Sequence, residues 1–170
     1  MNLATKILCL MVVFTAFVYG NAQSQATLSA LSSNESYKLE EQVVSLVKKR
    51  RRIELGISWK KSNPIVFSKR NRDLYIHSLE NILSDWDGYL SQTTAANQNI
   101  LNLGYLPTYR GELHLMFFRN LADGRSLPDN QPRLWMTYCK NNNEGCISGQ
   151  VHFYTKEQVA ILRDIISENL

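Results

Sequence analysis

Three short segments in the C-terminal half of the chain alternate between apolar and polar side chains. They cover residues 112–118, 133–139 and 148–154, and each is rich in aromatic or branched residues and bounded by turn formers. Alternation with a period of two is typical of a strand with one buried face. The pattern therefore predicts three antiparallel strands in this half of the chain.

The same alternation assigns each side chain to a face of the sheet, because successive residues of a strand point in opposite directions. The predicted core face holds Leu113, Leu115, Phe117, Leu134, Met136, Tyr138, Val151 and Phe153. The predicted polar face holds Glu112, His114, Arg133, Trp135, Thr137, Gln150, His152 and Tyr154.

The segment 140–145 joins the second and third predicted strands. It is rich in Asn and ends in Gly, and both residues tolerate the positive φ angles of tight loops. We expect a β-hairpin in which Cys139 faces Cys146 and Arg133 faces His152. In an oxidising compartment the two cysteines predict a disulfide, which should stabilise the hairpin by roughly 2–3 kcal/mol. Two reduced thiols or two metal ligands are the alternatives.

Apolar residues spaced three and four apart predict helices in the rest of the chain. One helix is predicted from Ser36 to about Arg52, although the alternation from Ile53 onward also fits a strand. A second helix follows Asn71, with a weak continuation towards Leu103. Its apolar stripe consists of Tyr75, Leu79, Ile82, Leu83, Trp86 and Leu90.

A final helix is predicted from Thr155 to the end of the chain, with Thr155 and Gln158 in capping-box positions. Its buried face should consist of Val159, Leu162, Ile165 and Ile166. The predicted fold class is therefore α+β. N-terminal helices precede a small antiparallel sheet of three to five strands with a disulfide-stapled hairpin, and a C-terminal helix follows.

The N-terminus has the layout of a secretory signal peptide. Lys6 precedes an apolar run over 7–19, and small residues precede a cleavage site expected after Ala22. The run is shorter than the roughly 20 residues that span a bilayer. We therefore expect a signal peptide over 1–22, a flexible segment over 23–35 and one α+β domain over 36–170, in a secreted or periplasmic protein.

The strongest charge cluster is the run Lys48, Lys49, Arg50, Arg51 and Arg52, in a chain of net charge +4. It could contact an anionic surface such as nucleic acid, a glycan or a membrane. The alternative is a solvated C-terminal helix end, where cations are favourable.

The chain carries none of the common nucleotide-binding, serine-hydrolase or zinc-protease motifs. The weak catalytic candidates are Glu112, His114, Arg133 and His152, which could cleave a phosphodiester or glycan by acid–base chemistry on the polar face. The layout is similar to that of microbial ribonucleases of the barnase type, although no motif of that family is present. The alternatives are ordinary polar residues on a wet sheet face, or a metal held by the histidines and Glu112.

Trp135 and Tyr154 on the same predicted face favour a different function, because exposed aromatics among polar groups are typical of binding sites. Burial under a helix is the alternative. The leading hypothesis is an exported, non-enzymatic binding or interaction module, such as an inhibitor, an immunity-type protein or an envelope accessory protein. Its partner would be a protein or another extracytoplasmic ligand, and no cofactor or metal is expected. A secreted hydrolase is the alternative.

Overall fold

The structure is a computed structural model that describes residues 28–33, 39–57, 63–120, 127, 130–142 and 145–170. The predicted signal peptide lies outside these residues. So does most of the segment predicted to be flexible.

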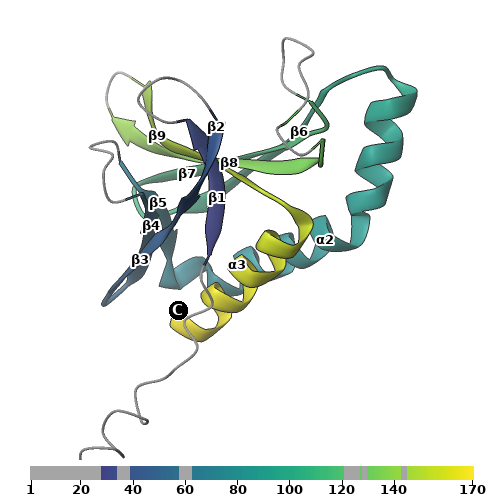
Figure 1. The fold of residues 1–170 in the computed structure, drawn as a ribbon. Coiled ribbons are helices and arrows are strands. Elements are labelled where there is room, and N and C mark those ends of the chain that lie inside the picture. The colour runs from purple at the N-terminus through teal and green to yellow at the C-terminus, as the bar shows by residue number, and fades with distance from the viewer. Residues whose placement is uncertain (1–27, 34–38, 58–62, 121–126, 128–129, 143–144) are drawn as a thin grey trace, which may run out of the picture.

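The described chain is an α+β fold of two antiparallel sheets and two α-helices (Figure 1). The elements in chain order are β1 (Ser29–Ser33), β2 (Leu39–Val43), β3 (Ser45–Lys49), β4 (Arg52–Gly56), β5 (Ile65–Ser68), the 3-10 helix η1 (Lys69–Asn71), α2 (Arg72–Ala95), β6 (Ile100–Thr108), β7 (Gly111–Phe118), β8 (Arg133–Asn142), β9 (Gly145–Tyr154) and α3 (Lys156–Asn169).

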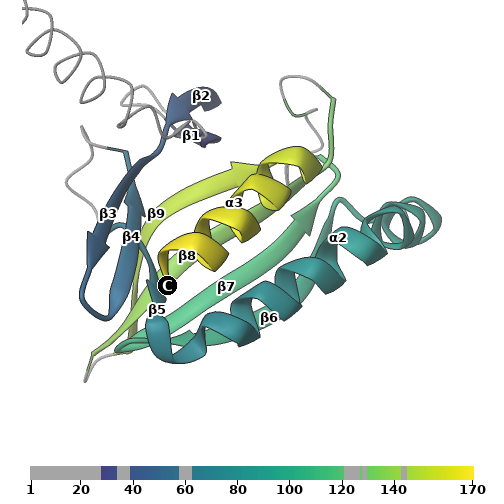
Figure 2. The same cartoon turned by 90° about the horizontal axis from the view of Figure 1, so that it is seen from below.

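The larger sheet has six strands in the order β2-β1-β9-β8-β7-β6, and the smaller has three in the order β3-β4-β5. Both helices lie on one face of the larger sheet (Figure 2). The α+β class is confirmed, but the sheet is larger than the predicted three to five strands. It includes β1, which lies within the segment that was predicted to be flexible.

The helix predicted over 36–52 is wrong where the structure describes this segment. Residues 39–43 form β2 and residues 45–49 form β3, and these strands pair with β1 and β4 respectively. The apolar spacing through Leu39, Val43 and Val47 imitates a helix, but β-branched valines also suit a strand, and sheet pairing decides the outcome. The strand suspected after Arg52 is confirmed as β4.

Helix α2 follows its predicted apolar stripe. Tyr75, Leu79, Ile82 and Trp86 are buried, and Leu83 and Leu90 pack partly buried beside them. The predicted continuation to Leu103 is wrong, because α2 ends at Ala95 and Asn97 takes a φ of 50°. The chain then enters β6.

Helix α3 confirms its predicted start and its predicted buried face. Thr155 accepts a hydrogen bond from the backbone N–H of Gln158, whose side chain accepts one from the backbone N–H of Thr155. Val159, Leu162, Ile165 and Ile166 are all buried.

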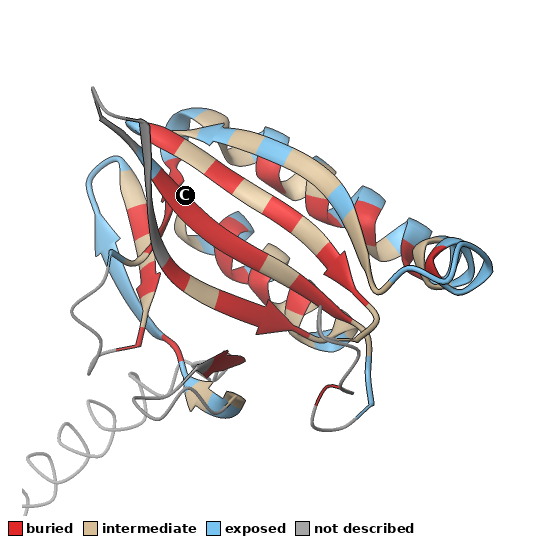
Figure 3. Cartoon of the chain, turned by 90° about the horizontal axis from the view of Figure 1, so that it is seen from above, coloured by how far each residue is buried: buried red, intermediate tan, exposed pale blue. Residues whose placement is uncertain are grey.

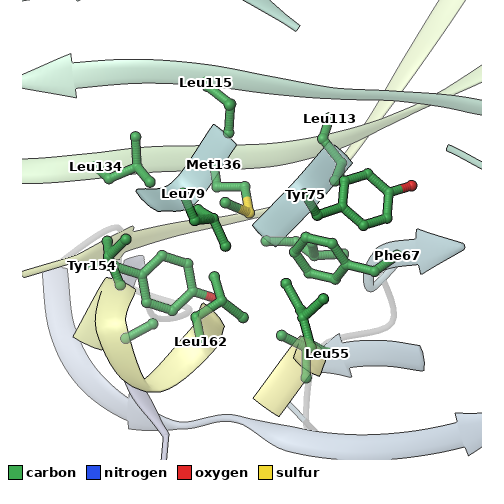
Figure 4. Close-up of a cluster of buried hydrophobic side chains, with 14 of the residues drawn as sticks. Leu55, Phe67, Tyr75, Leu79, Leu113, Leu115, Leu134, Met136, Tyr154 and Leu162 are labelled. Carbon is green, nitrogen blue, oxygen red and sulfur yellow. The ribbon is translucent and has the colours of Figure 1, made fainter. Parts of the chain in front are cut away.

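The main core lies between the larger sheet, the two helices and the smaller sheet (Figure 4). Leu79 from α2, Leu162 from α3 and Leu55 from β4 meet side chains of β7, β8 and β9 there. Burying each such leucine fully contributes roughly 1.5–3 kcal/mol. The smaller sheet is therefore part of the same folding unit as the larger one.

The predicted register of the β8–β9 hairpin is wrong. Cys139 faces Ser148, and Trp135 faces Phe153, so the pairing is shifted by two residues near the tip and by three further along. The strands continue closer to the tip than predicted, and an irregularity between Thr137 and Cys139 adds the extra residue of shift. Cys139 is disulfide-bonded. The side chain of its predicted partner, Cys146, lies outside the described part.

The assignment of faces is right for β7 and β8 and wrong for β9. Leu113, Leu115, Phe117, Leu134, Met136 and Tyr138 join the main core as predicted. Val151 and Phe153 instead join a second cluster with Leu31, Phe118 and Leu127, on the face away from the helices. Figure 3 shows this face, on which no helix of the described chain lies.

Candidate functional site: a basic cluster at one end of the sheets

The four predicted catalytic residues do not meet. Glu112 and His114 lie together on β7, with the carboxylate Oε2 3.4 Å from the imidazole Nε2. Arg133 is only 3% exposed, and its Nη1 lies 2.8 Å from Glu41 Oε1. His114 faces Thr137, four residues along β8 from Arg133, which corresponds to about 13 Å at the usual rise of a strand.

His152 lies on the opposite face of the sheet from Glu112, and it is fully buried. Its Nδ1 lies 2.8 Å from the Tyr154 hydroxyl, and its Nε2 lies 3.3 Å from Gln150 Oε1. Gln150 Oε1 also accepts a hydrogen bond from the Ile57 N–H at 2.9 Å. These residues therefore form a polar network inside the core, and the shared catalytic face predicted for His152 and Glu112 is wrong.

The predicted binding pair, Trp135 and Tyr154, is also divided between the two faces. Trp135 is half-buried and stacks on Phe118, with ring centroids 6.4 Å apart. Tyr154 is fully buried in the main core, and burial raises the pKa of its hydroxyl. The prediction of a binding surface made of these two aromatic residues is therefore wrong. Among the described residues, no group of three or more His, Cys, Asp or Glu side chains could hold a metal ion.

The basic run takes a form that the sequence did not predict. Lys48 and Lys49 end β3, Arg52 begins β4, and Arg50 and Arg51 form the turn between them. The run is therefore the tip of a β-hairpin and not a helix end. The stabilising effect of cations at a helix C-terminus does not account for it.

Two further turns bring more cations to this hairpin tip (Figure 2). The first is the corner between β5 and α2, which carries Lys69 and Arg70, and the Lys69 N–H donates to the Arg51 carbonyl at 2.8 Å. The second is the β6–β7 turn, formed by Tyr109 and Arg110. We call the residues Arg51, Arg52, Lys69, Tyr109, Arg70 and Arg110 together the basic cluster.

Tyr109 lies at the centre of the basic cluster. The guanidinium of Arg52 lies 5.6 Å from the centroid of the Tyr109 ring, and that of Arg110 lies 5.1 Å from it. Both distances are within the range of cation–π attraction. One exposed ring thus holds two arginines from different hairpins close together.

Hydrogen bonds from buried or helical residues fix the β6–β7 turn against the β5–α2 corner. Asn71 Nδ2 donates to the Pro107 carbonyl at 2.7 Å, and the Tyr75 hydroxyl donates to the same oxygen at 2.9 Å. The Tyr138 hydroxyl lies 3.2 Å from the Tyr109 carbonyl and 3.3 Å from that of Arg110. The three turns therefore have fixed positions relative to one another.

An open hollow of about 410 Å³ lies within the basic cluster. Its lining residues are Arg51, Ser68, Lys69, Arg70 and Tyr109. Within the described chain, no carboxylate forms an ion pair with the three cations of this lining. The Ser68 side chain is buried, with its hydroxyl 2.9 Å from that of Tyr75. Three cationic residues therefore border the hollow, whose walls are mostly apolar atoms, and the hydroxyl of Ser68 is not free to act as a nucleophile.

Glu54 on β4 is ion-paired with two cations of the β3–β4 hairpin. It accepts from Arg52 Nε at 2.7 Å, and Lys49 Nζ lies 2.8 Å from its other oxygen. Burial opposes its ionisation, but the hydrogen bonds from Lys49 and Arg52 outweigh burial, and the pKa of Glu54 is lowered. Glu54 thus neutralises one cation of this pair and leaves the lining of the hollow uncompensated.

Tyr138 lies beneath the cluster and responds to its charge. Burial raises the pKa of the Tyr138 hydroxyl, and the nearby guanidiniums of Arg52 and Arg110 act in the opposite direction. Two cations from separate hairpins therefore act on one hydroxyl, which agrees with their common position over Tyr109.

The positions of several cations in the basic cluster lower the local stability of the protein in the absence of a ligand. Lys69 and Arg70 lie just before Asn71, the N-cap of α2, and the N-terminus of α2 carries the positive end of the helix dipole. Arg110 has a φ of 68°, which is in the left-handed region. Residues other than Gly and Asn adopt this region only at a cost in free energy. Residues that oppose local stability in this way are common at binding sites.

Only one third of the basic cluster, Arg51 and Arg52, is evident from the sequence. The run at 48–52 was evident, but Lys69–Arg70 and Tyr109–Arg110 are short pairs without any local signal. Only the pairing of β4 with β5 and the bonds from Pro107 to α2 bring them beside Arg51. The charge cluster therefore depends on tertiary structure.

Comparisons with known proteins give no functional assignment. No family model matches the chain, and neither the curated proteins nor the solved structures include a significant match. In the part of the chain that the structure describes, no helix is long and apolar enough to cross a bilayer.

Proposed function

We propose that this protein is an exported, non-enzymatic binding module that holds an anionic ligand at the basic cluster. The observation that carries the proposal is the convergence of three separate turns on one open hollow, which two of them line with cations and the third lines with Tyr109. Guanidinium groups bind phosphate, sulfate and carboxylate groups through paired hydrogen bonds, and the ammonium of Lys69 adds a point charge.

The chemistry of the hollow supports binding and not turnover. A hydrolase needs an acid, a base and a charge-stabilising group around one point. The residues that line the hollow include no carboxylate and no histidine, and the Ser68 hydroxyl is buried against Tyr75. The hydrolase hypothesis on β7–β9 finds no support in the positions of Arg133 and His152.

The test is calorimetric titration of the mature protein with tripolyphosphate, a compact polyanion. Arg51→Gln combined with Arg70→Gln should weaken binding at least about ten-fold, because a hydrogen bond to a charged group contributes roughly 1.5–3 kcal/mol. Lys156→Gln combined with Arg163→Gln removes the same charge from α3 and should change binding less than about two-fold. Equal losses in both double variants would show that only net charge matters, and would contradict the proposal.

Export and the disulfide are two further parts of the proposal, and one experiment tests both. The support for export is the signal-peptide pattern, and the support for a Cys139–Cys146 pair is that Cys139 is disulfide-bonded. Mass spectrometry of the extracellular or periplasmic protein without reductant should find a chain that begins at Gln23 and a link between peptides containing the two cysteines. An intact N-terminus or a free Cys146 thiol would contradict the respective part.

A further inference from the structure

Exposed apolar side chains gather around the basic cluster. The large hydrophobic side chains that are exposed in the described chain are Val43, Leu46, Val47, Leu74, Tyr105 and Tyr109. Leu46 and Val47 belong to β3 and directly precede the basic tip, and Leu74 is in the first turn of α2, just after Arg70. Tyr109 is itself part of the cluster. Four of the six therefore belong to the cluster or lie within a few residues of its cations along the chain.

Strand β3 is unusually open for a strand with apolar residues. It pairs only with β4, and all five of its residues are exposed, with Leu46 at 38% and Val47 at 50%. Its hairpin with β4 lies at the outer end of the molecule, at the left in Figure 2. Lys48 and Lys49 are the kind of charged residue that protects an edge strand from pairing with another chain. This protection leaves the apolar side chains accessible to a partner that is not a strand.

A surface with cations and exposed apolar side chains suits one class of anionic partner better than the others. A free phosphate needs only the cations. A nucleic-acid duplex likewise needs only cations for its phosphates and leaves the exposed apolar side chains without a role. A single strand also stacks on aromatic faces, but the Tyr109 ring already interacts with Arg52 and Arg110. The surface of an anionic bilayer offers negative headgroups beside an apolar layer, and peripheral proteins bind it with this combination of residues.

We infer that the basic cluster docks on the surface of an anionic lipid bilayer, with the free edge of β3 entering the interfacial layer. Leu46 and Val47, which point to opposite faces of this edge strand, are both exposed there. The inference rests on the proposed function and names the source of the anion as a lipid headgroup. Each cation near an anionic surface contributes about a five-fold gain in affinity. Apolar side chains add to this gain by leaving water for the headgroup boundary.

The test is co-sedimentation of the mature protein with vesicles of mixed phosphatidylglycerol and phosphatidylcholine, beside vesicles of phosphatidylcholine alone. We expect binding to the anionic vesicles and none to the neutral ones. Leu46→Thr combined with Val47→Thr keeps the β propensity of β3, and should weaken vesicle binding at least ten-fold and leave tripolyphosphate binding unchanged. Val43→Thr, in the other sheet, is the control and should change neither. Thermal unfolding shows that each variant is folded.

Each other outcome overturns the inference in a distinct way. Tripolyphosphate binding without vesicle binding refutes membrane docking and leaves the proposed function intact, and retention on heparin in that case assigns the anion to a glycan. If the protein binds neither tripolyphosphate nor anionic vesicles, both the proposed function and membrane docking are refuted. Equal vesicle binding by the parent and the Leu46/Val47 variant refutes the insertion of the hairpin.

Discussion

At the scale of single residues, the basic cluster depends on which charges are compensated. Arg52 and Lys49 share the carboxylate of Glu54, whereas the cations that line the hollow have no such partner in the described chain. Identical residue types in one run of sequence therefore differ in what they can bind. The ion-paired residues stabilise the hairpin, and the remaining ones are available to an anion.

Glu54→Gln should destabilise the protein by about 1 kcal/mol at neutral pH, since it removes the acceptor of two charged groups. The folded-state pKa of Glu54 is lowered, so its stabilising effect is complete above the unfolded pKa of about 4.3 and is lost as the pH falls through the folded value. Urea unfolding at several pH values should show a difference from the parent that closes in acid. Glu80→Gln, an exposed residue of α2, serves as the control. A difference that persists at pH values well below the folded pKa would contradict this account.

Arg110 is the residue at which function and stability are expected to conflict. Its φ of 68° is easier for glycine, so Arg110→Gly should raise the stability by up to about 1 kcal/mol. The same change removes a cation from the cluster and should weaken tripolyphosphate binding several-fold. Unfolding and titration of one variant measure both effects. A loss of stability with no change in affinity would contradict the assigned role.

At the scale of elements, the β7–β8 pairing sets the position of the β6–β7 turn. Gly111 begins β7 directly after Arg110, and a Cβ at this position would lie 2.1 Å from the Cys139 carbonyl. The two strands are therefore so close at position 111 that only glycine can be accommodated there. This approach, together with the bonds from Tyr138, holds Tyr109 and Arg110 towards the hollow.

Gly111→Ala should lower the stability by more than about 2 kcal/mol, because backbone must move to admit the methyl group. Gly88 offers the matched control, since it is exposed in the middle of α2 and a Cβ there meets nothing within 4 Å. Gly88→Ala should raise the stability by about 0.5–1 kcal/mol through its helix propensity. Thermal unfolding of the two variants should give shifts of opposite sign. Shifts of the same sign would contradict the close approach at Gly111.

The elements also show which parts of the fold could be predicted from the sequence. Strands β7, β8 and β9 and helices α2 and α3 have strong local patterns, and all five were predicted. The helix prediction for residues 39–49 failed because Leu39, Val43 and Val47 fit both the helical and the strand periodicity. Only pairing with β1 and β4 decides between the two. The prediction of the buried face of β9 failed because a backbone irregularity near Thr137 and a buried polar network override the alternation of apolar and polar residues.

At the scale of the whole molecule, a buried polar network joins the two sheets. Gln150 on β9 accepts from the Ile57 N–H and donates to the Ile57 carbonyl, and its own N–H donates to the Asn63 carbonyl. His152 and Tyr154 extend the network beneath α3. The smaller sheet, which carries the hairpin tip, is thus tied to the larger sheet, which carries the β6–β7 turn.

Gln150→Leu should destabilise the protein by about 1–3 kcal/mol, because it leaves the buried N–H and carbonyl of Ile57 without partners. Gln92→Leu, on the exposed side of α2, is the control and should have little effect. Chemical unfolding measures both. If the two variants unfold alike, Gln150 does not couple the sheets.

The central claim is that one compact site formed by three separate turns binds an anion. The most direct measurement is an NMR titration of the ¹⁵N-labelled mature protein with tripolyphosphate, followed through the backbone amides. We predict saturable shifts at 50–52, 68–71 and 109–110 with a single affinity, and unchanged amides around Trp135 on β8. Shifts centred on the face of β7 and β8, or scattered shifts that do not saturate, would contradict the claim.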